Sequence, residues 1–270
     1  MSHRYFALSQ LGAAVATLAI STAASAAQVQ VKVTTENLAP SNSVSFAPLH
    51  VGFNNGTFDA FDNGQTATAG IISVAEGGGG MAWQADFALA DPTATRGTIP
   101  GPLQPGNIRT LTFTVDTAIN RFFTFGSMVV PSNDFFIGND SPTEYQLFDA
   151  AGNLLITSIV QKADEIWDAG SEAFDPLNAA FLAIGTNALR TEQNGVVSFN
   201  FSELSGFNGL TTATGYVFDS QLAADTDIYR ISFEIVPVPE PQTYALMVAG
   251  LVATGWIARR RGGKQGGSPT

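Results

Sequence analysis

Alternation of apolar and polar residues is the feature that most restricts how this chain can fold. Successive side chains of a β-strand point to opposite faces, so a period of two predicts strands with one buried face. The pattern is clearest at residues 28–34, 110–115, 197–202 and 230–235. Further strands are expected at residues 121–130, 144–149 and 154–160.

Turn residues separate these strands. The turns are expected at Asn54-Asn55-Gly56, Asp62-Asn63-Gly64 and Ala151-Gly152-Asn153, and the last predicts a hairpin. Only residues 71–76 and 177–184 look like short helices, and Gly77–Gly80 is expected to be a flexible loop. Many short strands joined by such turns predict an all-β fold, an antiparallel β-sandwich, as one domain over residues 28–236.

The N-terminus is expected to be a cleavable signal peptide over residues 1–27. A basic residue, Arg4, precedes a short apolar run at residues 11–20, and small residues follow at Ser25-Ala26-Ala27. This order is typical of secretory signals. The sequence therefore predicts export.

The C-terminal segment, residues 237–270, combines prolines, an apolar stretch and arginines. The apolar stretch, residues 244–258, is shorter than the ~20 residues that span a bilayer comfortably, and the basic end would stay in the cytoplasm. The motif residues are Pro239, Glu240, Pro241, Arg259, Arg260 and Arg261. This order resembles the PEP-CTERM sorting signal. The resemblance implies exosortase-type machinery, transient passage through the inner membrane, and a final place at the cell surface or in an exopolysaccharide or biofilm matrix.

Charge and composition exclude several functions. Between residues 28 and 236 the chain has 7 basic and 22 acidic residues, a formal charge of −15, which disfavours nucleic acid as a partner. The chain has no Cys, so disulfides, thiol nucleophiles and Cys-zinc sites are excluded. His50 is the one histidine of the body, and no G-x-S-x-G motif accompanies it, so we expect a structural histidine.

Acidic residues mark two expected loops. Asp134 follows the strand that ends at Pro131, and Asp168 and Glu172 flank Gly170 further along the chain. Three carboxylates that converge repel one another unless a cation or protons neutralise them, and oxygen ligands favour calcium. The pattern predicts a Ca²⁺ site at Asp134, Asp168 and Glu172. Taken singly, each aspartate is more typical of a residue that caps a turn.

These loops resemble two motifs of the spondin-N domain found in F-spondin and mindin. The matching runs are Met128-Val129-Val130-Pro131-Ser132-Asn133-Asp134-Phe135-Phe136-Ile137-Gly138 and Trp167-Asp168-Ala169-Gly170-Ser171-Glu172. The chain departs from the family pattern at Asn133, Phe135 and Glu172, where the family has Pro, Trp and Asp. The resemblance covers residues 29–233. It implies a calcium-binding, spondin-like β-sandwich with the motif carboxylates as ligands.

Two adjacent aromatic residues, Phe135 and Phe136, are a candidate partner surface. In an extended segment one of two adjacent side chains points away from the core. We expect this ring to contact an extracellular polysaccharide or a matrix protein.

The favoured function is an exported, non-enzymatic, calcium-binding domain for adhesion or scaffolding in the extracellular matrix. The alternative is a carbohydrate-binding module for exopolysaccharide. A carboxylate-based hydrolase is the least favoured hypothesis, because glycosidases need two carboxyl groups ~5–10 Å apart in a cleft and no motif selects such a pair.

Overall fold

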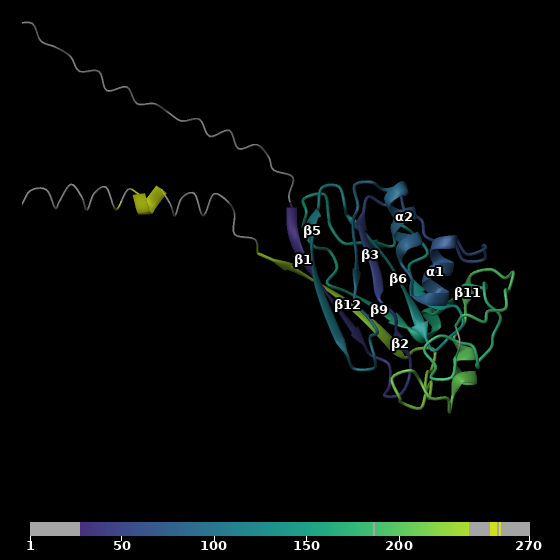
Figure 1. Cartoon of the computed structure of the whole chain (residues 1–270). Helices are drawn as coiled ribbons and strands as arrows, with labels where there is room; N and C mark the ends of the chain where they lie inside the picture. Colours follow the sequence, from purple (N-terminus) through teal and green to yellow (C-terminus); the bar gives the residue numbers. More distant parts are fainter. Residues whose placement is uncertain (1–27, 186, 238–248, 253, 255–270) are drawn as a thin grey trace, which may run out of the picture.

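The computed structural model describes residues 28–185, 187–237, 249–252 and 254. They form two antiparallel β-sheets packed face to face, with two helices outside the larger sheet (Figure 1). This confirms the predicted sandwich. The predicted signal peptide lies outside the described residues, as does most of the C-terminal segment. No helix among the described residues is long and apolar enough to cross a membrane.

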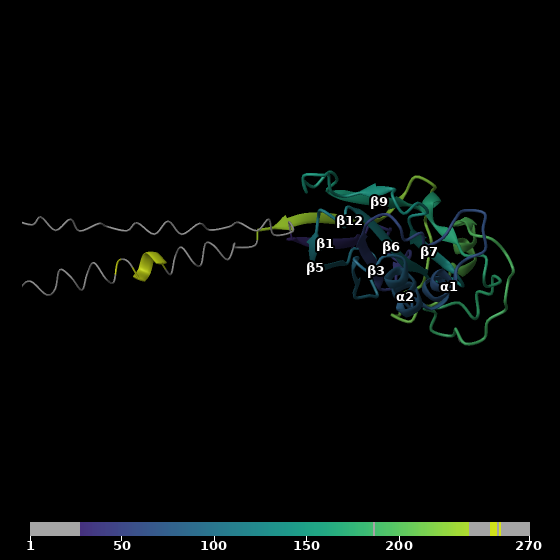
Figure 2. The ribbon, with the colours of Figure 1, turned by 90° about the horizontal axis from the view of Figure 1, so that it is seen from above.

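The smaller sheet has four antiparallel strands in the order β5-β1-β12-β9 (Figure 2). Its strands are β1 (Gln28–Asn37), β5 (Ile108–Asp116), β9 (Ser158–Lys162) and β12 (Asp227–Val236). Val31 of β1 lies opposite Phe113 of β5 and Ile235 of β12. Burial alternates along β1 as the sequence predicts, because the outer face of this sheet is not covered by another layer of secondary structure.

The larger sheet follows the order β11-β10-β7-β6-β3-β4, and β2 and β8 also pair with β6. Its strands are β2 (Ser45–Phe46), β3 (Leu49–Asn54), β4 (Thr95–Ile99), β6 (Phe122–Val130), β7 (Phe135–Gly138), β8 (Tyr145–Gln146), β10 (Trp167–Asp168) and β11 (Ser198–Phe199). Two short 3₁₀ helices lie at Ala163–Glu165 and Ser202–Phe207.

The main core lies between the sheets. Phe53 of β3 meets Phe113 of β5 with ring centroids 5.4 Å apart, and Phe123 of β6 meets Phe233 of β12 at 4.9 Å. Such aromatic pairs join the two inner faces of the sandwich.

Helices α1 (Ala69–Gly77) and α2 (Met81–Ala90) cover the outer face of the larger sheet (Figure 1). A second apolar cluster fills this layer. Phe87 of α2 stacks on Phe58 at 4.0 Å and lies so close to Gly52 of β3 that a Cβ there would be 2.0 Å from its ring. Both sheets and all apolar clusters lie within residues 28–236, so we expect this segment to fold on its own.

Four local predictions differ from the structure. Residues 177–184 contain no helix, and the predicted strand at 144–149 shortens to β8. The strand predicted at 154–160 shifts to β9, and the one predicted at 197–202 shortens to β11, because a 3₁₀ helix begins at Ser202. Helix α2 was not predicted, since its exposed face carries Met81 and Leu89 and the sequence has no helical amphipathicity. The turn between β8 and β9 is confirmed, because the Asp149 carboxylate accepts hydrogen bonds from the backbone of Ala151 and Asn153. The predicted hairpin is reduced to one bridge between Phe148 and Leu154, since β8 pairs with β6 and β9 pairs with β12.

Candidate functional site

The two motif stretches come together at neighbouring strands of the larger sheet. Strand β7 pairs with β10, so that Phe135 lies opposite Asp168 and Phe136 opposite Trp167. The chain continues from β10 into residues 169–172, and the backbone N–H of Ala169 donates to the carbonyl oxygen of Asp134 at 3.1 Å. The predicted meeting of the two loops is therefore confirmed.

Asp134 connects the loops through its side chain. Its Oδ2 atom accepts hydrogen bonds from the backbone N–H of Ser171 at 2.7 Å and of Glu172 at 2.9 Å, and from the Ser171 hydroxyl at 3.2 Å. The residue is only 2% exposed. A buried carboxylate that accepts several hydrogen bonds fixes the loop that supplies them.

Burial, and to a smaller extent the charge of Asp168, raise the pKa of Asp134 to about 7 against the lowering effect of the hydrogen bonds from residues 171 and 172. The pair of carboxylates therefore favours a proton or a cation near neutral pH.

Asp168 shapes the turn that follows it. Its Oδ1 accepts from the Gly170 N–H at 2.7 Å, and its Oδ2 accepts from the side-chain amide of Asn200 at 3.1 Å. Gly170 has φ +64°, and a Cβ there would lie 2.7 Å from the backbone nitrogen of Val196. Glycine is required on both grounds.

The Glu172 carboxylate has partners other than the two aspartates. Asn133 donates to Glu172 Oε1 at 3.1 Å, and its side chain also exchanges hydrogen bonds with the backbone of Asp175. Burial raises the pKa of Glu172; the hydrogen bond from Asn133 and the charge of Arg190 lower it, and the charge of Glu76 raises it. Asn133, a departure from the spondin pattern, thus holds residues 172–175 in place.

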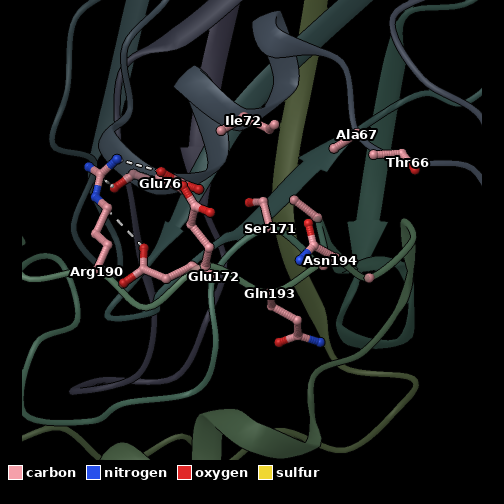
Figure 3. A pocket seen from close by; sticks show the side chains of 13 residues that line it. Thr66, Ala67, Ile72, Glu76, Ser171, Glu172, Arg190, Gln193 and Asn194 are labelled. Carbon is pink, nitrogen blue, oxygen red and sulfur yellow. Dashed lines mark hydrogen bonds and ion pairs between the residues drawn. The ribbon is translucent and has the colours of Figure 1, made fainter.

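Sequence reasoning missed Arg190, which lies between the carboxylates of Glu76 and Glu172 (Figure 3). Its Nη1 donates to Glu76 Oε2, its Nη2 donates to the Glu76 carbonyl at 3.2 Å, and its Nε lies 3.8 Å from Glu172 Oε2. A cation at the C-terminal end of α1 is also favourable for the helix dipole. The one available signal is that Arg190 is the only Lys or Arg between residues 163 and 229.

A pocket with a volume of about 600 Å³ opens beside this network; we call it the α1 pocket. Helix α1 contributes Ile72 and Glu76, the 168–172 loop contributes Glu172, and the segment 190–195 contributes Arg190, Gln193 and Asn194 (Figure 3). Its size is within the range of small-molecule sites.

The structure brings together only two of the three predicted calcium ligands. Asp134 and Asp168 influence each other electrostatically, whereas the charged neighbours of Glu172 are Glu76, Arg190 and Asp175. Among the described residues no group of three His, Cys, Asp or Glu side chains is arranged to hold a metal ion. The predicted three-carboxylate cluster is therefore not formed, and calcium binding stays a prediction.

The expectation that Phe135 or Phe136 exposes a ring is wrong. Phe135 is 3% exposed and packs between the sheets, and Phe136 is fully buried in the cluster beneath the helices. The larger sheet is covered on both faces, so neither side of β7 meets solvent. The exposed aromatic ring in this region is instead Phe199, which stacks on Trp167.

His50 has the surroundings expected of a structural residue. Its ring nitrogens contact the Thr98 hydroxyl at 3.0 Å and the Gly78 carbonyl at 3.1 Å. Burial lowers the pKa of His50, and the contact with Gly78 raises it. These contacts tie β3 to the end of α1.

Comparison with known proteins finds one match, over residues 237–261, to the family described as the PEP-CTERM protein-sorting motif. A search of curated proteins finds no match. Neither comparison supports the resemblance to spondin-N domains, which stays a prediction. The PEP-CTERM motif indicates an exported protein that exosortase machinery recognises and that is transiently anchored in the membrane.

Proposed function

We propose that the body of this chain, residues 28–236, is a non-enzymatic domain for adhesion or scaffolding in the extracellular matrix. The observation that carries the proposal is the Asp134 carboxylate, which joins the two spondin-like motif stretches into one preformed site. The sorting motif supports a place of action outside the cytoplasm. A preformed site binds without an ordering cost, as a scaffold requires.

The test is retention of labelled residues 28–236 on extracellular matrix taken from cells that produce the protein. The intact domain is expected to be retained. Asp134→Ala is expected to lower retention at least tenfold, since residues 171–172 lose their hydrogen-bond acceptor. Asp225→Ala, which removes an exposed carboxylate, is the matched control. Equal retention of all three proteins, with circular dichroism unchanged, would contradict the proposed site.

Calcium is the cation that we propose for Asp134 and Asp168, whose repulsion it would relieve. Titration calorimetry of the chelator-treated domain is expected to give one ion with Kd ~0.1–1 mM, as for extracellular calcium modules. Binding should disappear in Asp168→Asn and persist in Asp164→Asn. If the intact domain does not bind calcium, the calcium proposal is wrong, and the adhesion role is then tested by the retention assay alone.

Carbohydrate binding is the second candidate function, and Phe199 favours it. This residue is 52% exposed, and its ring stacks on Trp167 with centroids 3.7 Å apart and planes 24° apart. A ring held flat with one face free is suited to packing on the apolar face of a sugar. Loss of matrix retention in Phe199→Ala, but not in Phe174→Ala, would support this function. Equal retention of both variants would oppose it.

A further inference from the structure

The α1 pocket contains a buried acceptor without a hydrogen-bond donor. Glu172 is 3% exposed, and its Oε1 accepts from Asn133. Its Oε2 is buried and has no hydrogen-bond partner among the described residues. The nearest cation, Arg190, is 3.8 Å away from it, which is too far for a hydrogen bond. A buried carboxylate oxygen that accepts no hydrogen bond is costly even with a cation 3.8 Å away, so a donor supplied by a ligand would be favourable here.

Arg190 lies beside this oxygen in the lining of the α1 pocket. Its side chain is 37% exposed, and its three hydrogen bonds, to Glu76 and Asn187, use three of its five N–H groups. Both Glu172 and Arg190 line the α1 pocket. The remaining N–H groups of Arg190 are available to an acceptor on a ligand.

The opposite rim carries two amide side chains on a fixed backbone. Residues 191–195 pair with 170–173, through hydrogen bonds from Ala173 to Thr191, from Gln193 to Ser171 and from Gly195 to Gly170. The side chains of Gln193 and Asn194 are exposed, and they make no hydrogen bonds within the described part of the chain. Each offers both a donor and an acceptor.

The charge of the pocket restricts the ligand. Glu76, Glu172 and Glu192 line it together with one cation, Arg190, which disfavours an anion. Donors and acceptors are mixed around the pocket, and Ile72 provides an apolar wall. Hydroxyl groups match such a lining, since each one both donates and accepts.

We infer that the α1 pocket binds an uncharged, hydroxyl-rich saccharide unit. One hydroxyl donates to Glu172 Oε2, others bond to the amides of Gln193 and Asn194, and the C–H face of the ring packs on Ile72. This inference rests on the proposed extracellular role and names a ligand class for it. The site does not involve Phe199 or a bound cation.

The test is binding of residues 28–236 to immobilised tetrasaccharides of glucose, mannose and galactose, with uronate tetrasaccharides and a lysine-rich peptide alongside. At least one neutral tetrasaccharide is expected to bind saturably. The double variant Gln193→Ala/Asn194→Ala should weaken binding about tenfold or more, which corresponds to about 1.4 kcal/mol. Gln104→Ala is the matched control, and Glu172→Gln tests the buried acceptor.

The double variant Gln193→Ala/Asn194→Ala is expected to fold normally, because both side chains are exposed and their loss leaves the core intact. No binding to any neutral tetrasaccharide would overturn the inference, as would preference for uronates or the peptide, or a double variant that binds like the intact domain. If Gln193→Ala/Asn194→Ala loses saccharide binding but keeps matrix retention, the saccharide site is supported and matrix retention depends on another part of the domain.

Discussion

Asp134 is the residue on which the candidate site depends. It is buried beside Asp168 and accepts three hydrogen bonds at one oxygen. Burial and the charge of Asp168 favour the neutral carboxyl group, whereas the three hydrogen bonds favour the charged carboxylate. A structural aspartate with one acidic neighbour and a raised pKa is unusual, since buried carboxylates are normally paired with cations.

This environment predicts a pH dependence of stability. Because the folded-state pKa is raised from 3.8 to about 7, the folded state holds a proton that the unfolded chain has lost. The contribution of Asp134 to the free energy of unfolding is therefore full below about pH 4 and falls as the pH rises to about 7. Urea unfolding in chelator should show a slope over this range that Asp134→Asn removes.

Asp168→Asn is the companion variant for this prediction. It removes the neighbouring charge, so the slope between about pH 4 and about pH 7 should become shallower without disappearing. A wild-type slope equal to that of Asp134→Asn would show that the carboxyl group titrates normally.

At the scale of elements, the contact between α2 and β3 fixes the helical layer over the sheet. Phe87 occupies the space above Gly52, where a Cβ would lie 2.0 Å from its ring. We predict that Gly52→Ala destabilises the domain by about 1–3 kcal/mol, because the ring must leave its position. Gly77→Ala is the control, since its Cβ would meet only the Arg190 side chain at 3.6 Å. Equal thermal unfolding midpoints for Gly52→Ala and Gly77→Ala would contradict this packing.

Alternation in the sequence predicts the strands that have one uncovered face, and among the strands buried on both faces β6 was predicted as well. Strands β1, β5 and β12 alternate in burial, and their sequences alternate with them. Strands β3 and β7 are buried on both faces, so their sequences show no period of two. The same burial explains why Phe136 could not be an exposed ring.

The candidate site was predictable only in part, for the same physical reason. Motif spacing placed Asp134 near Asp168 and Glu172. The ion pair between Arg190 and Glu76 joins residues 114 positions apart, and no local pattern reports such a contact. The partners of Glu172 therefore became visible only when α1 and the 190–195 segment were placed in the fold.

On the scale of the whole molecule, the point where the sorting motif begins and the candidate site lie at different ends of the sandwich. The start of β1 and the end of β12 lie at the same end of the two sheets, so both chain ends leave from one end of the domain (Figure 1). The sorting motif begins directly after β12, at residue 237. The candidate site lies toward the other end of the sandwich, beside β7 and α1 (Figure 2), where loops 133–134 and 168–172 meet.

The central claim is that the Asp134 carboxylate holds the two motif stretches together as one site. Hydrogen exchange at the amides of Ser171 and Glu172 measures this directly, because both donate to Asp134 Oδ2. We predict slow exchange in the intact domain and fast exchange in Asp134→Ala at these two amides, with the amides of Ile231 and Phe233 unchanged. Equal protection of Ser171 and Glu172 in both proteins would contradict the account.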